Sequence, residues 1–297
     1  MSSTRIQRTS FREATLAFAF GTLGALFQLA CGGGGGGGTT TPPPPPAPVI
    51  TSFSAAKTPI TAGTSTTLTA VFANGTGSVD KGVGAVTSGT TAPVSPSADT
   101  TYTLTVTNAA GTTATATAAL AVAAAPTVPV ITAPSNVTAS QTGYTATTLP
   151  QAGMTLAWTI TNGTFTSATS GASVTFQAGA TGSVGLSCTA TNAAGTTSAA
   201  GTTSSTVVAA PMATALVATA NPVPFSGTTT ITPAFSGGIG SVDQGVGVVA
   251  SGTPFGSGAV SGAKTFTLTV TNAAGSTATA SVTLTTQAVS VGAITPA

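Results

Sequence analysis

Histidine is absent from this chain of 297 residues, and charged side chains make up only 3% of it. Arg5, Arg8, Arg12 and Glu13, all near the N-terminus, supply the whole formal charge of +2. The later charges cancel, three of each sign, at Lys57, Asp80, Lys81, Asp99, Asp243 and Lys264. Nucleic-acid binding depends on Lys and Arg side chains that neutralise phosphates. We therefore expect no nucleic-acid partner.

The scarcity of titratable groups also argues against catalysis. General acid–base chemistry needs a group whose pKa lies near the working pH, usually His or a paired carboxylate, and the last Glu is Glu13. Metal sites need clusters of His, Cys or oxygen ligands. Asp80 and Asp243 stand singly in Asp-x-Gly sequences, which are typical of tight turns. We predict a protein that is not an enzyme, with no catalytic residue, cofactor or metal site.

The first residues have the parts of a secretory signal peptide. Basic residues precede an apolar run from Ala14 to Ala30, and a small residue precedes Cys31. The run is at the lower limit for spanning a bilayer, so an uncleaved membrane anchor is the alternative. We predict a signal peptide over residues 1–30 and export of the remainder.

The sequence Gln28-Leu29-Ala30-Cys31 resembles the lipobox of bacterial lipoproteins, with Ala30 and Cys31 flanking the cleavage site. Gln28 stands where that family usually has Leu. An unbroken glycine run follows at 32–38, as is common in the family. The resemblance implies lipid attachment at Cys31. By the sorting habit of that family, Gly rather than Asp at residue 32 implies that the lipoprotein is sent to the outer membrane. An ordinary signal peptide with an incidental Cys is the alternative.

Residues 31–47 form a linker that is rich in Gly, Thr and Pro. The glycines favour flexibility, whereas Pro42 to Pro46 favour extended polyproline II. Several acyl chains on one residue hold a protein at a membrane almost permanently. We expect this linker to lift the rest of the chain away from such a surface.

Threonine is abundant, with 66 residues, and its β-branched side chain favours strands. The pentapeptide Thr-Asn-Ala-Ala-Gly occurs at 107–111, 191–195 and 271–275, between segments that alternate polar and apolar residues. A period of two that is interrupted by a Gly-containing turn predicts a β-hairpin. We predict an all-β chain with three modules, at 48–126, 127–210 and 211–288, and a C-terminal tail at 289–297.

The modules resemble bacterial Ig-like repeats of surface lipoproteins, through the pattern Tyr-x-Leu-x-Val-x-Asn-Ala-Ala-Gly that begins at Tyr102. Asp99 and Tyr102 are similar to the tyrosine corner of Ig sandwiches. Ala263 and Phe266 take these places in the third module, while the second resembles PKD-like domains, with a core strand at 155–160. The resemblance implies three tandem Ig-like β-sandwiches.

Cys188 has no predicted disulfide partner, because lipid attachment would use Cys31, the one other cysteine. Ig domains often have the second cysteine of a disulfide at this place, but here we predict a buried thiol close to Trp158.

Asn108 lies in a predicted turn and is expected to be exposed. A crosslink between Lys57 and Asn108 is therefore not expected.

Three functions fit these observations. The leading one is a non-catalytic cell-surface lipoprotein, a stalk of Ig-like modules with a structural, spacer or adhesive role. The second is a glycan- or polymer-binding module, although such sites usually use exposed aromatic residues, and aromatics are 5% of this chain. The third is the N-terminal stalk of a larger surface protein, because 289–296 resembles the start of another module. The expected partners are a membrane, through the lipid anchor, and a surface polysaccharide or another protein. Whether the stalk faces outward or into the periplasm stays open.

Overall fold

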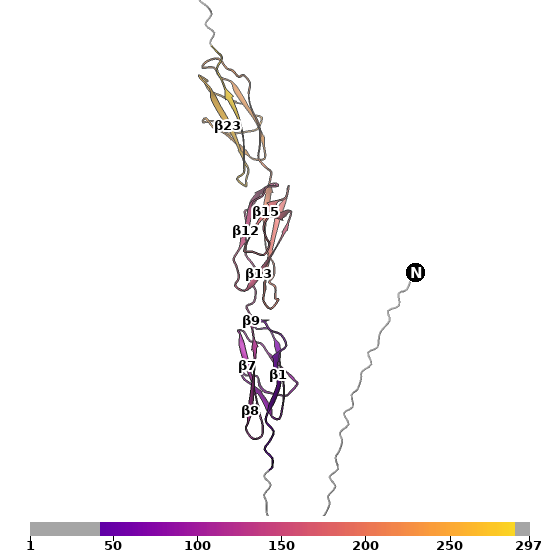
Figure 1. The fold of residues 1–297 in the computed structure, drawn as a ribbon. Coiled ribbons are helices and arrows are strands. Elements are labelled where there is room, and N and C mark those ends of the chain that lie inside the picture. The colour runs from indigo at the N-terminus through magenta and orange to yellow at the C-terminus, as the bar shows by residue number, and fades with distance from the viewer. Residues whose placement is uncertain (1–41, 289–297) are drawn as a thin grey trace, which may run out of the picture. The chain divides into compact units, whose positions relative to one another are not determined.

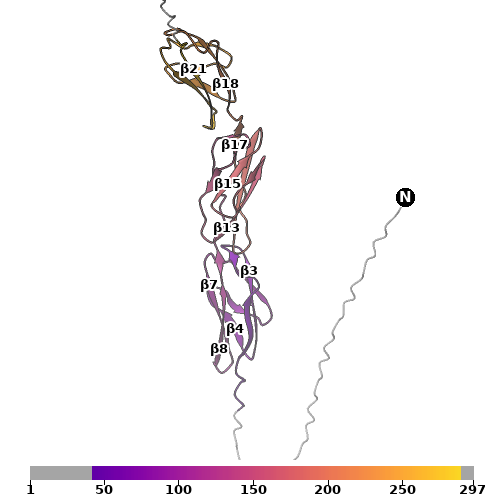
Figure 2. The same cartoon turned by 45° about the horizontal axis from the view of Figure 1, so that its top comes forward.

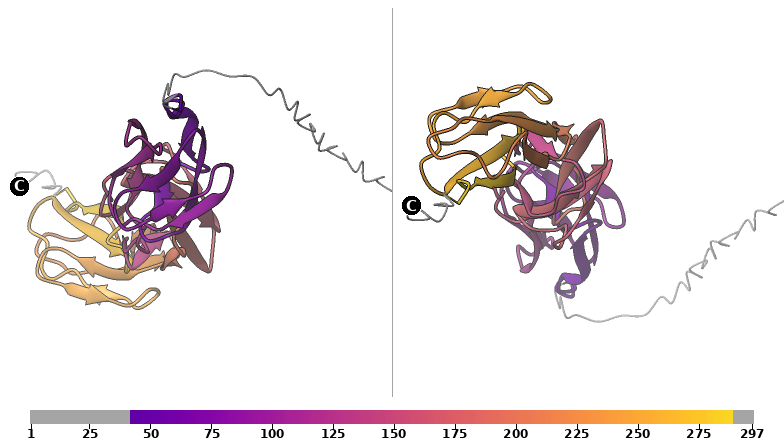
Figure 3. Two further views of the ribbon diagram at one scale, coloured as in Figure 1. Left: turned by 90° about the horizontal axis from the view of Figure 1, so that it is seen from below. Right: turned by 90° about the horizontal axis from the view of Figure 1, so that it is seen from above.

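The computed structural model describes residues 42–288, and every regular element in that range is a β-strand (Figures 1, 2 and 3). The same range holds no helix with the length and apolar character needed to cross a bilayer. The predicted signal peptide, Cys31 and the C-terminal tail lie outside the described residues. The strands form three groups, and each group encloses a hydrophobic core of its own. We call these groups modules 1, 2 and 3.

Module 1 is a sandwich of two antiparallel sheets, ordered β1-β3-β6 and β5-β4-β7-β8. Strands β2 and β9 form a short parallel pair, which places the start of the module beside its last strand. This strand order is that of an Ig-like fold. The strands are β1 (Val49–Ala55), β2 (Ile60–Thr61), β3 (Thr66–Ala73), β4 (Thr76–Val79), β5 (Gly84–Val86), β6 (Thr91–Val94), β7 (Thr100–Thr107), β8 (Thr113–Leu120) and β9 (Val122–Ala123).

Module 3 repeats this order, with sheets β18-β19-β22 and β21-β20-β23-β24. An isolated parallel bridge between Val223 and Thr286 stands where module 1 has its parallel pair. The strands are β18 (Met212–Ala218), β19 (Thr230–Ser236), β20 (Ile239–Val242), β21 (Gly247–Val249), β22 (Phe255–Gly256), β23 (Lys264–Thr271) and β24 (Thr277–Leu284).

Module 2 differs in detail, with sheets β10-β12-β15-β14 and β11-β17-β16-β13. Here β11 pairs in parallel with β17, which again places the start of the module beside its last strand. The strands are β10 (Ile131–Thr132), β11 (Asn136–Thr138), β12 (Tyr144–Thr148), β13 (Met154–Thr161), β14 (Gly163–Phe165), β15 (Ser173–Ala178), β16 (Ser183–Asn192) and β17 (Gly201–Val208).

The alternating sequence pattern explains how each sheet buries one face. In β7, Tyr102, Leu104 and Val106 are buried, while the threonines between them face outward. Their partners across the hairpin are also hydroxyl residues, as in the pairs Thr105 with Thr115 and Thr107 with Thr113. Alternate residues of a strand point to opposite faces, so one period of two builds both a core and a neutral, hydroxyl-covered surface. The prediction of an all-β chain with tandem Ig-like sandwiches is confirmed.

The corner at the start of β7 is held by a carboxylate. The Oδ1 atom of Asp99 accepts the backbone N–H of Val122 at 2.6 Å, which ties this corner to β9. In module 3, Phe266 is buried and the Nζ of Lys264 lies 4.8 Å from the centre of its ring. The third module thus packs its corner with an aromatic ring.

Candidate functional site at the joints between modules

Each Thr-Asn-Ala-Ala-Gly sequence forms a hairpin turn that is organised by its asparagine. In module 1, the Oδ1 of Asn108 accepts the backbone N–H of Ala110 at 3.1 Å and of Thr112 at 2.9 Å. Asn192 and Asn272 accept from the residues two and four places later in the same way. The glycine that ends each pentapeptide has a positive φ, between 79° and 84°, which Gly adopts at little cost.

The three asparagines are buried, with 5 to 8% of each residue exposed. The prediction that Asn108 is exposed is therefore wrong. Turn residues lose contact with water only when something covers them, and here the cover is the chain that enters each module. The amide nitrogen of each of these three asparagines donates a hydrogen bond to the entering segment. This contact was not predicted from the sequence.

At the joint between modules 1 and 2, the Nδ2 of Asn192 donates to the carbonyl oxygen of Ala124 at 2.8 Å. It also donates to the hydroxyl of Thr61, in module 1, at 2.9 Å. That hydroxyl lies 2.6 Å from the hydroxyl of Thr196, which follows the turn. One asparagine therefore binds its own module to the linker and to the preceding module.

The joint between modules 2 and 3 repeats this arrangement. The Nδ2 of Asn272 donates to the carbonyl of Ala209 at 2.9 Å and to the hydroxyl of Thr138 at 2.9 Å. The hydroxyls of Thr138 and Ser276 are 2.7 Å apart, and Ser276 donates to the Oε1 of Gln141 at 2.7 Å. The same three parts recur: a turn asparagine, a linker carbonyl and a hydroxyl at the end of the preceding module.

The two hydroxyl residues hold equivalent places in their modules. Thr61 lies opposite Ala123 in the parallel pair of module 1, and Thr138 lies opposite Val208 in that of module 2. Both are buried. In module 3 the residue after Val223 is Pro224, which has no hydroxyl to offer.

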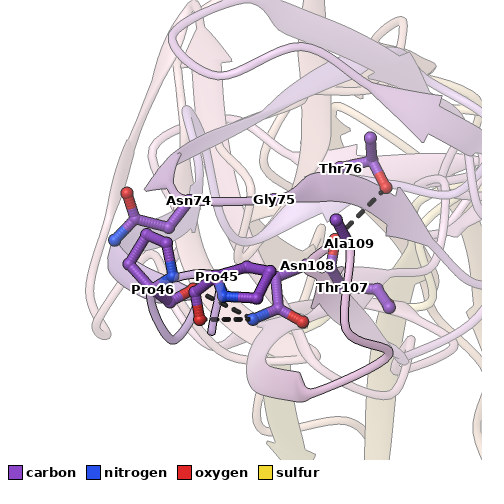
Figure 4. Close-up of a pocket in the computed structure, with 8 residues that line it drawn as sticks. All are labelled: Pro45, Pro46, Asn74, Gly75, Thr76, Thr107, Asn108 and Ala109. Carbon is purple, nitrogen blue, oxygen red and sulfur yellow. Dashed lines mark hydrogen bonds between the residues drawn. The ribbon is translucent and has the colours of Figure 1, made fainter. Parts of the chain in front are cut away.

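In module 1, the same turn binds the proline-rich linker (Figure 4). The Nδ2 of Asn108 donates to the carbonyl of Pro46 at 2.9 Å and lies 3.5 Å from that of Pro45. Asn74 adds a bond from its Nδ2 to the carbonyl of Ala47, at 3.1 Å. These residues border a hollow of about 420 Å³ that is lined by Pro45, Pro46, Asn74, Gly75, Thr76, Thr107, Asn108 and Ala109.

Length and energetics make these contacts relevant to bending. Three residues, 209–211, separate β17 from β18. A hydrogen bond contributes roughly 1 kcal/mol net, but an abandoned buried donor costs roughly 1–3 kcal/mol. A joint that moves must break two bonds of the asparagine amide together. These hydrogen bonds therefore oppose bending at both joints.

The acidic residues have structural roles in the described range. Asp80 and Asp243 each accept a backbone N–H of the neighbouring strand, from Thr103 and Thr267, at 2.8 Å. Their Asp-x-Gly sequences form turns, with Gly82 at a φ of 83°. Between residues 42 and 288, no group of three His, Cys, Asp or Glu residues comes together. The turn interpretation of both aspartates is confirmed.

Cys188 and Trp158 lie opposite each other in the pairing of β13 with β16, and both are buried. The indole nitrogen of Trp158 donates to the carbonyl of Gly171 at 2.8 Å. Burial raises the pKa of the Cys188 thiol above its ordinary value, while a backbone hydrogen bond with Ala157 opposes the shift. The prediction of a buried thiol close to Trp158 is confirmed.

Two of the three lysines of the modules bind backbone oxygens. The Nζ of Lys57 donates to the carbonyl of Ala194 at 3.3 Å, across the joint between modules 1 and 2. The Nζ of Lys264 donates to the carbonyl of Ser257 at 3.1 Å. Lys57 thus contacts the turn of Asn192 rather than Asn108.

No protein-family model matches this sequence, and no curated protein does so. Among solved structures, the chain is similar to an I-band fragment of titin with three Ig domains, at 14% identity and a TM-score of 0.43, over 81% of this chain and 99% of that one. It is similar to the D1–D4 ectodomain fragment of ICAM-5 at 16% identity and a TM-score of 0.44, over 82% and 76%. Extracellular domains 3–5 of Drosophila OTK match at 14% identity and a TM-score of 0.35, over 82% and 99%. At these scores the assignment of Ig-like modules rests on the strand order described above.

Proposed function

We propose that this chain is a non-catalytic, exported stalk, in which tandem Ig-like modules serve a spacer or adhesive role at a cell surface. The observation that carries the proposal is the repeated joint, in which Asn192 and Asn272 each bind a linker and the preceding module. Connected domains move freely by default unless their interface restrains them. A chain that builds the same restraint twice is suited to holding its far end at a distance.

The surface chemistry supports a spacer. Within the described range, the acidic carboxylates shape turns and corners, and strand faces carry threonine rather than charge. Trp158 is buried, which removes it from the surface residues that could bind a glycan. These features favour a passive, soluble body over a reactive one.

The anchor is the other half of the proposal. Attachment of lipid at Cys31 would fix one end of the stalk to the outer membrane, and residues 31–47 would serve as its tether. Globomycin blocks lipoprotein signal peptidase, so we expect the unprocessed precursor to accumulate in treated cells. Normal maturation under the drug would contradict lipid attachment at Cys31.

The stalk itself is tested by nitrogen-15 relaxation of the full chain with Cys31→Ser, purified in detergent. We expect the three modules to share one rotational correlation time. Three independent, shorter correlation times would show freely jointed modules and would overturn the spacer proposal.

A further inference from the structure

The turns that precede β4 in module 1 and β20 in module 3 share one backbone. The first residue of each turn has a positive φ, 62° at Asn74 and 75° at Gly237. The second is a glycine pressed against the neighbouring strand, because a Cβ added to Gly75 would lie 2.6 Å from the carbonyl oxygen of Thr107. Gly238 is confined in the same way. The second place therefore requires glycine, whereas the first is asparagine in module 1 and glycine in module 3.

Module 1 thus combines an asparagine with a following glycine, and this pair is chemically reactive. The backbone nitrogen of the glycine gives up its proton and attacks the carbon of the side-chain amide. A new bond between carbon and nitrogen forms, ammonia leaves, and a cyclic succinimide remains. Water then opens the ring to aspartate or isoaspartate. The net change is hydrolysis of the side-chain amide, with water as the co-reactant, and glycine permits it because no side chain hinders the attack.

Both reacting groups of this pair in module 1 are accessible. Asn74 and Gly75 are exposed and border the hollow shown in Figure 4. Between residues 42 and 288, the backbone N–H of Gly75 finds no acceptor, so the attacking nitrogen is free of hydrogen bonds. The leaving amide has a single bond, from the Nδ2 of Asn74 to the carbonyl oxygen of Ala47 at 3.1 Å. The reaction therefore has one hydrogen bond to break.

Asn162 and Gly163 form the second Asn-Gly pair of the chain and provide an internal control. Asn162 also has a positive φ, 53°. Its Nδ2 donates to the carbonyl oxygens of Thr181 at 2.6 Å and Ser183 at 3.1 Å. A Cβ added to Gly179 would collide with its Oδ1, so this amide is closely enclosed. One further hydrogen bond must break here, which slows the reaction about fivefold or more.

Conversion of Asn74 would alter the contact between module 1 and its tether. The donor Nδ2 becomes a carboxylate oxygen, which cannot donate to the carbonyl oxygen of Ala47 and repels it. The bond from Asn108 to the carbonyl of Pro46 does not involve this amide and is retained. The product therefore weakens the hold on the tether without abolishing it.

We propose that Asn74 is a self-modifying site: it deamidates through the succinimide, and the product releases Ala47 of the tether from module 1. The reaction takes place without an enzyme. Because ammonia is lost to the solvent, the change accumulates with the age of each molecule. It depends neither on lipid attachment nor on the joints between modules.

Peptide mapping of the aged protein tests the reaction. The full chain is incubated in detergent at physiological temperature and mildly alkaline pH. Trypsin cleavage after Lys57 and Lys81 then yields a peptide in which Asn74 is the one asparagine. We expect this peptide to gain the mass difference between an amide and an acid, and its isoaspartate fraction to be methylated by protein isoaspartyl methyltransferase. Conversion should be at least about fivefold faster than at Asn162, which is followed in a peptide from a second protease.

Asn74→Gly is the matched control, because module 3 has Gly237 at this place. The variant should fold normally and give no acid at residue 74. A synthetic peptide of residues 58–81 shows that the conditions permit the reaction. An unreacted Asn74 under conditions that convert the synthetic peptide, or equal rates at Asn74 and Asn162, would overturn the modification site.

The release of Ala47 is tested separately with Asn74→Asp, which carries the acid from the start. The carbonyl carbon-13 resonance of Ala47 should move to the position that it has in Asn74→Gly, where residue 74 offers no side-chain donor. If Ala47 kept its wild-type resonance in Asn74→Asp, the acid would not free the tether.

Discussion

The amide of Asn272 donates to the hydroxyl of Thr138 at 2.9 Å, across 134 positions of sequence. The oxygen of the same side chain accepts two backbone N–H groups of its own turn, from Ala274 and Ser276. The two ends of one carboxamide therefore have separate tasks. The oxygen shapes the hairpin, and the nitrogen joins module 3 to module 2.

These tasks can be separated by substitution. Asn272→Asp keeps an acceptor for the turn but loses the donor, so we expect module 3 to stay folded while the joint loosens. Asn272→Ala loses both and should lower the free energy of unfolding of module 3 by about 1–3 kcal/mol. Chemical denaturation measures the stability, and nitrogen-15 relaxation measures whether modules 2 and 3 tumble together.

Thr138→Val provides the matched control, because it removes the acceptor hydroxyl and leaves the turn of Asn272 untouched. It should loosen the joint as Asn272→Asp does. If modules 2 and 3 kept the tumbling of the wild type in both variants, the hydrogen bonds of Asn272 would not be what restrains this joint.

A second prediction concerns Gly237, at the entry to β20. Its φ is 75°, and a Cβ added there would collide with the carbonyl oxygen of Ala210 in the linker. Gly252 has a similar φ of 78° with open space around its Cβ position. Gly252→Ala should therefore cost about 1–2 kcal/mol from backbone strain alone, and Gly237→Ala should cost clearly more. Equal losses in thermal or chemical denaturation would show that the linker does not press on Gly237.

Cys188 gives a third prediction, with a defined sign. Because burial raises its pKa, the folded state favours the neutral thiol. This contribution is fully present below the ordinary pKa of a thiol, about 8.5, and is lost as the pH rises through the higher pKa of the folded state. Module 2 should lose stability above about pH 8.5. Fluorescence of Trp158, the one tryptophan of the chain, reports on this module alone.

Cys188→Ala is the control for this pH dependence. It should lower the stability of module 2 at every pH, because it leaves a cavity, but the fall above pH 8.5 should flatten. A thiol reagent should also label Cys188 in the native wild type only as fast as module 2 opens. Rapid stoichiometric labelling of the folded protein would contradict the burial of this residue.

The aspartate turns give a fourth prediction. Asp243→Asn retains an acceptor for the backbone N–H of Thr267 and should change stability by less than about 1 kcal/mol, whereas Asp243→Ala should cost about 1–3 kcal/mol. Calcium or a chelator should leave the melting temperature of both the wild type and Asp243→Asn unchanged. A calcium-dependent rise in the wild type that Asp243→Asn abolishes would reveal a metal role.

Local patterns in the sequence were sufficient for most of the fold. The alternation around Leu104 predicts β7, and the positions of Cys188 and Trp158 predict their shared core, because burial in a strand follows from period and residue type alone. The burial of Asn108 could not be predicted in this way. Asn is common in turns, so its presence there indicates no distant partner. The residue that Asn192 binds, Thr61, lies 131 positions away in the sequence. The repetition of all five residues of the pentapeptide, more than a hairpin requires, was the available signal.

Pro224 bears on how such a chain could grow. An in-frame duplication of module 2 would carry both halves of its own connection, the turn around Asn192 and the acceptor Thr138, so the new copy would fit its neighbours at once. At the equivalent place in module 3, Pro224 offers no hydroxyl to the turn asparagine of a unit joined behind it. A further unit joined behind module 3 in the same way would lack this hydroxyl acceptor unless Pro224 were also replaced.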